Sequence, residues 1–184
     1  MTEVGIAHGR FQIVHYDHLK YVMAAKAKCE HLVVGITNPD PSLTRDDKSD
    51  PARSTTEANP LTYYERYRML KAALLEQGLS ADNFVVVPFP INFPDLYKHY
   101  VPLDATFFLT IYDAWGEKKL EMFESLGLKT EVLWRKPLSE KGITSTDIRH
   151  RIISGEPWKQ LVPYSVARLL EELDILKRLK DGES

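Results

Sequence analysis

Short apolar runs alternate along the chain with longer segments in which apolar residues recur every three or four positions. The runs cover residues 4–7, 31–37, 83–88, 105–111 and 130–134. Residues 32–36 and 84–87 are apolar at consecutive positions, so both faces of each run are expected to be buried. Such runs are typical of parallel β-strands inside a sheet, whereas the spacing between them predicts amphipathic helices.

Helix start and stop signals stand between the runs. Thr62 opens a capping box, and Gly78 can end the same helix. Thr144 and Asp147 form a second capping pair. The expected helices begin near His18 and cover residues 62–78, 113–127, 144–155 and 165–180.

This alternation predicts an α/β fold, a single Rossmann-like, doubly wound sheet of five parallel strands. We expect residues 1–184 to form one domain, with residues 156–184 as a C-terminal helical segment. Ligands of such sheets bind beyond the carboxyl ends of the strands. The segments that follow the first, second, fourth and fifth strands are therefore expected to converge on one site.

Residues 38–61 form a connection that is long for a compact domain. They contain four prolines and charges of both signs. Long connections without secondary structure of their own are usually functional loops or disordered segments. We therefore expect a substrate or lid loop whose residues 40–57 become ordered over a bound substrate, with an ordinary mobile loop as the alternative.

The composition is that of an ordinary globular protein, with 43% of the 184 residues hydrophobic and 27% charged. The net charge of −2 offers no general attraction for nucleic acid or an anionic membrane, and no apolar stretch is long enough to cross a bilayer. Cys29 is the only cysteine, which excludes a disulfide framework. The first residues lack the pattern of a secretory signal. We expect a cytoplasmic protein without nucleic-acid or membrane partners.

His15 and His18 follow the first predicted strand and stand at the start of the first predicted helix. Residues three apart lie on the same side of a helical turn. Backbone N–H groups at a helix start are unpaired and carry partial positive charge, so two imidazoles there form a site for a polyphosphate. Taken alone, the pair is more simply interpreted as two surface histidines in a loop between strand and helix.

A second candidate anion site lies at the start of the helix expected after the fifth strand. Thr144, Ser145 and Thr146 supply hydroxyls, and Arg149 follows on the same side of the helix as the last two. Backbone amides, hydroxyls and a guanidinium together suit a phosphate group. A plain helix cap with a surface arginine is the alternative. The predicted position at the same sheet edge as the histidine pair favours a shared ligand site.

Residues 9–18 read Gly-Arg-Phe-Gln-x-x-His-x-x-His, which resembles the GRFQPxHxGH signature of nucleotidyltransferases. Residues 144–149 resemble the second signature of that superfamily, I-S-S-T-x-x-R. Residues 59–66, 87–97 and 155–163 resemble stretches of one branch, the archaeal-type nicotinamide-mononucleotide (NMN) adenylyltransferases. The chain is thus similar to HxGH-motif nucleotidyltransferases over nearly its whole length.

The resemblance implies a nucleotidyltransferase domain over residues 1–184. Its reaction moves a nucleoside monophosphate from a nucleoside triphosphate to a phosphate acceptor and releases pyrophosphate; in the archaeal branch, ATP and NMN give NAD. The implied cofactor is Mg²⁺ bound through the substrate phosphates, with no metal-ligating protein residue. The implied partners are ATP or another nucleoside triphosphate, a small phosphorylated acceptor and further copies of the chain in a homo-oligomer.

The resemblance also implies roles for individual residues. Because the implied reaction needs no covalent nucleophile, Cys29 is assigned to packing. The histidines of the pair would stabilise charge at the α-phosphate, and the arginine of the second signature would hold the β- and γ-phosphates. The implied catalytic residues are His15, His18 and Arg149. The implied nucleotide-binding residues are His8, Gly9, Arg10, Phe11, Ser145 and Thr146. The implied acceptor-binding residues are Asn38, Tyr97, Tyr112 and Trp115.

The chain departs from the family pattern in its first signature. Asp17 stands where the family has glycine, Ile13 where it has proline, and His8 where it has an apolar residue. A carboxylate beside a triphosphate is repelled unless it binds a cation or points away. Asp17 is therefore expected to approach the metal or to orient a basic side chain such as His8 or Arg10.

The acceptor side departs further. Tyr97 stands where the branch has tryptophan, so it is the expected ring for stacking on nicotinamide, and residues 110–115 replace an SNNP-like run. Two alternatives to NMN adenylyl transfer therefore stay open. One is a cytidylyltransferase or adenylyltransferase for another phosphate or phosphonate acceptor. The other is a non-catalytic nucleotide-binding protein in which Asp17 has abolished turnover.

Overall fold

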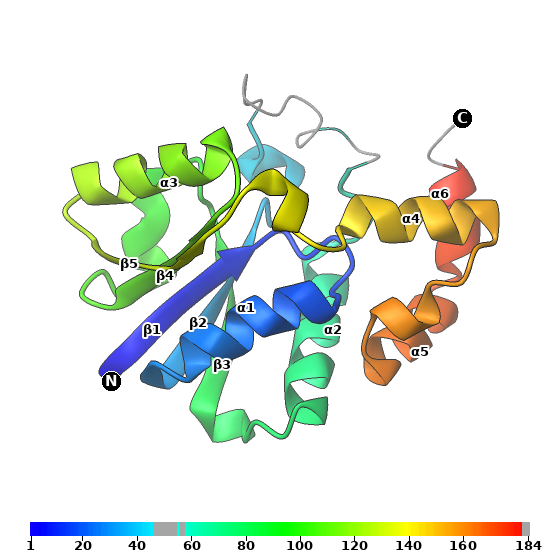
Figure 1. Cartoon of the computed structure of the whole chain (residues 1–184), viewed down its shortest axis with the longest axis horizontal. Coiled ribbons are helices and arrows are strands. Elements are labelled where there is room, and N and C mark those ends of the chain that lie inside the picture. The colour runs from blue at the N-terminus through cyan, green and yellow to red at the C-terminus, as the bar shows by residue number, and fades with distance from the viewer. Residues whose placement is uncertain (46–54, 56–57, 182–184) are drawn as a thin grey trace.

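The computed structural model describes residues 1–45, 55 and 58–181 and shows one parallel sheet with helices on both faces (Figure 1). The strands are β1 (Thr2–Gly9), β2 (Cys29–Thr37), β3 (Phe84–Phe89), β4 (Thr106–Ile111) and β5 (Lys129–Arg135). They pair in the order β3-β2-β1-β4-β5, and every pair is parallel. This confirms the predicted doubly wound, Rossmann-like sheet, with β1 at its centre.

The helices connect these strands in the predicted order. They are α1 (Tyr16–Lys26), α2 (Tyr63–Glu76), α3 (Ala114–Ser125), α4 (Ser145–Ser154), α5 (Tyr164–Glu172) and α6 (Ile175–Asp181). Short 3-10 helices lie in the connections: η1 (Pro41–Leu43), η3 (Ala81–Asn83), η4 (Pro94–His99), η5 (Leu138–Glu140) and η6 (Lys159–Leu161). The predicted capping boxes at Thr62 and Thr144 are both formed. Within the described part of the chain, no helix combines the length and apolarity that a membrane span requires.

Two helix boundaries differ from the prediction. α1 begins at Tyr16 because His15 caps it: the imidazole Nδ1 accepts a hydrogen bond from the His18 N–H at 3.4 Å. The segment predicted as one helix over residues 165–180 divides into α5 and α6 at Asp174, whose φ of 48° is left-handed. Both helices bury apolar residues, which is why the sequence pattern continues across the break.

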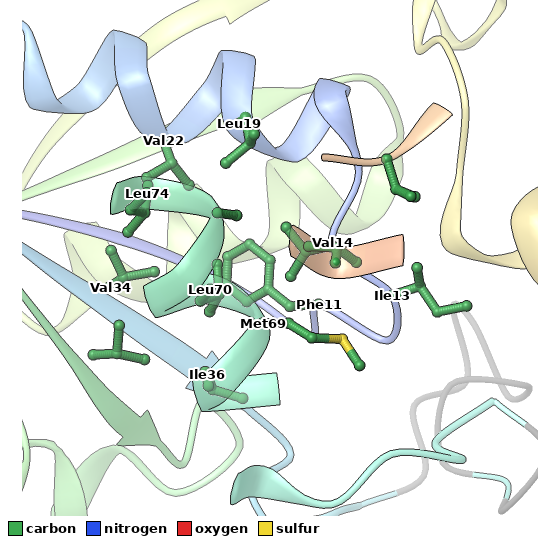
Figure 2. Close-up of a cluster of buried hydrophobic side chains, with 14 of the residues drawn as sticks. Phe11, Ile13, Val14, Leu19, Val22, Val34, Ile36, Met69, Leu70 and Leu74 are labelled. Carbon is green, nitrogen blue, oxygen red and sulfur yellow. The ribbon is translucent and has the colours of Figure 1, made fainter. Parts of the chain in front are cut away.

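Two hydrophobic clusters lie on the two faces of the sheet. The larger one joins the sheet to α1 and α2. Figure 2 shows its centre, where Phe11 and Val14 of the loop after β1 meet Met69 and Leu70 of α2. The second cluster joins the sheet to α3 and η4, and Phe123 of α3 is buried in it. The loop after β1 is thus anchored in the core on the α2 side.

Successive residues of β1 point to opposite faces of the sheet. Ala7 belongs to the larger cluster, and Ile6 belongs to the second cluster. His8, the penultimate residue of the strand, contacts Phe89 and Phe123 of the second cluster. The carboxyl end of β1 therefore directs the His8 side chain to the α3 face.

The two C-terminal helices pack against α2 and α4. α5 packs against α2, and α6 packs against α4. Arg178 of α6 donates to both carboxylate oxygens of Glu65 at 2.8 Å, and Arg68 pairs with Glu172 at 3.2 Å. Cys29 is buried in the larger cluster, in agreement with its predicted packing role.

Candidate active site

A cavity of about 360 Å³ opens at the carboxyl edge of the sheet. It lies where the loops after β1, β2, β3 and β4 meet the segment that leads into α4. Most of the predicted site residues line it, namely His8, Gly9, Arg10, Phe11, His15, His18, Asn38, Tyr112, Trp115, Ser145 and Thr146. Arg149 and Tyr97 do not. The structure thus brings the two signature motifs together, as their positions after the strands suggested.

The loop after β1 has a strained backbone. Phe11 has a φ of 53°, and Ile13 has a φ of 120°. A β-branched residue rarely adopts such a φ, so surrounding contacts have to hold Ile13 in place. The Phe11 ring lies across Gly9, where an added Cβ would lie 3.0 Å from it. The close approach therefore favours glycine at this position, since any other residue would require the ring to move.

His15 and His18 form a stacked pair at the start of α1, with ring centroids 3.6 Å apart and planes inclined by 23°. Burial lowers the pKa of His15 to about 4. The pKa of His18 is lowered well below its ordinary value by burial first, and then by His15 and Arg10. Both rings are therefore neutral at pH 7 in the free protein. His15 accepts at Nδ1 from the His18 N–H, so it carries its own proton on Nε2, from which it can donate to a phosphate oxygen. His18 has a hydrogen bond to the Ile13 backbone, and its Nδ1 has no partner among the described residues.

Ser145 and Thr146, at the start of α4, also line the cavity. The Ser145 hydroxyl donates to the Ile13 carbonyl at 3.0 Å and so joins the second signature to the first. Arg149, 7% exposed, lies behind them: Nη1 donates to the Gln12 carbonyl and Nη2 to the Thr146 hydroxyl, both at 3.1 Å. Arg149 thus holds the strained loop against α4. Its contact with the β- and γ-phosphates stays a prediction.

Asp17, the departure from the family glycine, also connects the two signatures. Its Oδ2 accepts a hydrogen bond from the Ile143 N–H at 2.9 Å. Gly142, with a φ of 76°, makes room for this contact, because a Cβ there would lie 2.6 Å from the carboxylate. The carboxylate therefore holds the segment before α4 against the first turn of α1. This partner differs from those expected from charge alone, which were a metal, His8 or Arg10.

Replacement of Asp17 by glycine is expected to lower kcat/KM for the nucleoside triphosphate about 10-fold or more, because a hydrogen bond to a charged group contributes about 1.5–3 kcal/mol. Asp17→Asn is the matched control, since its amide oxygen can still accept from Ile143. Steady-state kinetics and thermal unfolding of the three proteins measure both effects. A gain of activity in Asp17→Gly would mean that the carboxylate obstructs the nucleotide, which favours the non-catalytic alternative.

Polar groups line the flank of the cavity at the ends of β2 and β3. Asn38 directly follows β2, and its side-chain oxygen lies 3.5 Å from the amide nitrogen of Asn92. The guanidinium of Arg45 lies 4.1 Å from the centroid of the Phe93 ring. Asn92 and Arg45 line the cavity with Asn38, but the sequence did not single them out. The position of Asn92 shortly after a strand end is the signal that could have found it.

Aromatic groups line the opposite flank, at the ends of β4 and β5. The Trp134 indole N–H donates to the Tyr112 hydroxyl at 2.6 Å, and Trp115 lies in the first turn of α3. β1 separates β4 from β2 in the sheet, so this flank stands two strand spacings, or about 10 Å, from Asn38. The predicted acceptor residues are therefore divided between two flanks of the cavity.

Tyr97 lies in the core and not in the cavity, which corrects its predicted stacking role. The side chain is 1% exposed, and its ring centroid lies 4.6 Å from that of Phe89. The hydroxyl donates to the Ile91 carbonyl at 2.5 Å. A ring enclosed by the second cluster and fixed by its hydroxyl cannot turn toward a ligand without disrupting that cluster.

A buried arginine organises the backbone on the β2 side of the site. Arg66 of α2 is 1% exposed and donates to the carbonyls of Arg10 at 2.9 Å and of Thr37 and Asn38 at 2.8 Å. Burial lowers the pKa of Arg66 to about 10, so the group is still charged at pH 7. Arg66 was not predicted as a functional residue, although a charge on the apolar inner face of a helix is a usable signal.

Gln12 attaches the end of the long connection to the first signature. Its side-chain amide donates to the Leu61 carbonyl at 3.1 Å and accepts from the Leu61 N–H at 3.0 Å. Residues 46–54 and 56–57 lie outside the described residues, so the predicted closure of residues 40–57 over a substrate stays a prediction.

Comparison with known proteins gives consistent matches. A family model described as cytidylyltransferase-like matches residues 6–151. A phosphonoformate cytidylyltransferase of Streptomyces viridochromogenes is 47% identical, over 96% of this chain and 95% of its own length. A nicotinamide-nucleotide adenylyltransferase of Thermococcus kodakarensis is 31% identical, over 98% of this chain and 88% of its own length.

A solved structure confirms the fold. It is a bifunctional NMN adenylyltransferase/ADP ribose pyrophosphatase from Francisella tularensis, complexed with AMP and a manganese ion. It superposes with a TM-score of 0.68 at 15% sequence identity, over 99% of this chain and 52% of that chain. At this identity the likeness concerns the fold alone.

Proposed function

Because the chain belongs to the cytidylyltransferase-like family and is a nucleotidyltransferase, we propose that it transfers a cytidylyl group from CTP to a small phosphonate or phosphate acceptor. Identity to the phosphonoformate cytidylyltransferase is 47%, against 31% to the T. kodakarensis adenylyltransferase over a similar length. This difference supports CTP and a phosphonate over ATP and NMN.

The observation that carries the proposal is the character of the flank at β2 and β3. Asn38, Asn92 and Arg45 line it, whereas Tyr97, the ring expected to stack on nicotinamide, is buried in the core. Amides and a guanidinium suit a small anion with several oxygen atoms. The nicotinamide ring of NMN is a flat cation, which the guanidinium of Arg45 would repel.

The chemistry requires an oxygen of the acceptor to attack the α-phosphorus of the triphosphate. The bond between that phosphorus and the oxygen bridging to the β-phosphate breaks, and pyrophosphate leaves with the electron pair. His15 can donate the N–H of its neutral ring to an oxygen on which charge develops. His18, whose Nδ1 has no partner among the described residues, can donate there once the charge of the bound phosphates favours its protonated form. The start of α4, with Ser145 and Thr146, suits the departing phosphates. No covalent intermediate with the protein is required.

In this proposal, Mg²⁺ binds together with the triphosphate. Among the described residues, no group of three or more His, Cys, Asp or Glu side chains could hold a metal ion. The carboxylates at the cavity are engaged by the protein: Asp17 by Ile143, and Asp113 by Gly116 and Lys141. When bound, Mg²⁺ would therefore be held mainly by phosphate oxygens and would neutralise part of their charge.

Pyrophosphate release with the four nucleoside triphosphates against phosphonoformate, inorganic phosphate and NMN tests the proposal. We expect CTP with phosphonoformate to exceed every other pair in kcat/KM by about 10-fold or more. Phosphorus NMR of the product should show a new phosphonate–phosphate anhydride.

Adenylyl transfer to NMN is the second candidate, favoured by adenylyltransferases that match nearly the whole chain. Preferred use of ATP and NMN in the same assay would select it and reject the cytidylyl proposal. Absence of pyrophosphate release with every pair, in a protein that still binds a nucleoside triphosphate, would select the non-catalytic alternative.

A further inference from the structure

Both ring nitrogens of His8 are buried without a hydrogen-bond partner among the described residues. The side chain is 5% exposed and lines the cavity. The rings of Phe89 and Phe123 flank it, with centroids 5.6 and 5.3 Å away. Because phenyl rings do not replace the hydrogen bonds that imidazole makes in water, both nitrogens carry an uncompensated desolvation cost.

The surroundings of His8 are apolar. Ile6, two residues earlier in β1, is fully buried in the second cluster. Gly35 pairs with His8 in β2 and leaves space for Phe89, since a Cβ on it would come 2.8 Å from that side chain. The contacts of the imidazole with the rings of Phe89 and Phe123 leave both of its nitrogens without a hydrogen-bond partner among the described residues. A buried polar group of this kind is explained by a ligand that supplies the missing hydrogen-bond partner.

The His8 ring is neutral, and cationic side chains line the cavity around it. Burial, followed by Lys119, lowers the pKa of His8 well below its ordinary value. A neutral imidazole offers one N–H and one lone pair. Lys119 and Arg10 line the same cavity, so a ligand oxygen that accepts from His8 is stabilised further when it carries negative charge.

His8 and the histidine pair lie toward opposite faces of the sheet, and therefore toward different ends of the cavity. His15 and His18 stand at the start of α1, which packs on the larger cluster, whereas His8 points to the α3 face. A reacting phosphonate must lie beside the α-phosphorus near the pair. The other end of the same acceptor can then extend toward His8.

We propose that His8 determines acceptor specificity by donating its N–H to a carboxylate oxygen that the acceptor carries beside its phosphonate. Phosphonoformate, which the 47% identical relative is named for, has a carboxylate on the phosphorus. This inference rests on the proposed function and gives His8 an acceptor role in place of the nucleotide-binding role that the resemblance implied.

The test compares phosphonoformate with methylphosphonate, which lacks the carboxylate, in wild type, His8→Leu and His8→Gln. We expect wild type to prefer phosphonoformate by about 10- to 100-fold in kcat/KM. His8→Leu should bring this ratio close to one through a higher KM for phosphonoformate, with KM for CTP changed less than about 2-fold. His8→Gln keeps an N–H donor and should restore part of the preference. Ile6→Leu, on the same face of β1 and outside the cavity lining, is the packing control.

Thermal unfolding separates this role from a structural one. His8→Leu removes two unpaired polar atoms, so its Tm should equal or exceed that of wild type. A full phosphonoformate preference in His8→Leu would overturn the inference, as would a higher KM for CTP with unchanged acceptor kinetics. A wild type that uses ATP and NMN and neither phosphonate would reject the proposed function as well, and that result is distinct from the first two.

Discussion

Replacement of His18 by alanine is expected to lower kcat about 10²–10³-fold, the usual effect of removing one preorganised donor to a developing negative charge. Nδ1 of His18 has no partner among the described residues, and the ring lies 3.6 Å from His15 and 5.0 Å from Phe11 between centroids. Stacking therefore fixes the ring before the substrate arrives. No reorganisation is needed when charge shifts to the leaving pyrophosphate.

Substitution of His18 tests the catalytic role of a ring more directly than substitution of His15 does, because His15 also caps α1. The cap of α1 uses the His15 side chain and only the backbone N–H of His18, so His18→Ala leaves it intact. His15→Ala would lose the cap as well, at a cost of about 1 kcal/mol in the free energy of unfolding. His99, exposed in η4 and outside the cavity lining, offers a matched control for the loss of a histidine.

The measurements are steady-state turnover by pyrophosphate release and the Tm of each variant. Because burial lowers the pKa of His15 to about 4, and that of His18 well below its ordinary value, both rings are neutral at pH 7 in the free protein. Neither should therefore impose a change of kcat/KM between pH 7 and 8, since kcat/KM reports the free enzyme. A change of the wild-type kcat/KM in that range that disappears in His18→Ala would contradict a neutral ring in the free protein, and a His18→Ala variant with most of its kcat would remove the ring from catalysis.

The sheet was predictable because each strand is a short apolar run with helix signals on either side. Two boundaries were missed for local reasons. His15 acts as an N-cap although imidazole does not belong to the usual set of Ser, Thr, Asp and Asn. Asp174 adopts a left-handed φ without being glycine, so nothing in the pattern marks the end of α5.

The site was predictable in position and less so in detail. Spacing correctly places Arg149 beside Thr146, but the long side chain then folds back to the Gln12 carbonyl. Tyr97 matches an aromatic position of the family, yet alignment cannot tell a ring that faces a ligand from one whose hydroxyl is satisfied inside the core. Asp17 was interpreted from its charge, whereas its partner, the Ile143 N–H, is a backbone atom that no sequence pattern identifies.

Arg66→Met is expected to lower the free energy of unfolding by about 3–5 kcal/mol, because several buried carbonyls each lose a donor at a cost of about 1–3 kcal/mol, and to reduce Tm by roughly 10 °C. Methionine fills much of the volume but donates no hydrogen bond. The carbonyls of Arg10, Thr37 and Asn38 would then lose the donor that satisfies them inside the protein. Chemical denaturation with circular dichroism measures the loss.

Arg68→Met is the matched control on the same helix. Arg68 pairs with Glu172 at the surface, with 35% and 58% of the two side chains exposed, so its loss should cost less than about 1 kcal/mol. Equal destabilisation by the two substitutions would mean that the methionine, and not the lost buried donor, is responsible.

Arg66→Lys separates the charge of the guanidinium from its shape. Lysine keeps the positive charge, but its compact ammonium cannot span the carbonyls that the planar fork reaches in two loops. The variant should fold with a stability between those of wild type and Arg66→Met. It should also raise KM for both substrates about 10-fold, because Arg10 and Asn38 lose their common anchor at the cavity. If lysine restored full stability and KM, charge alone would suffice, and the fork of hydrogen bonds that joins the loops after β1 and β2 would not position the site.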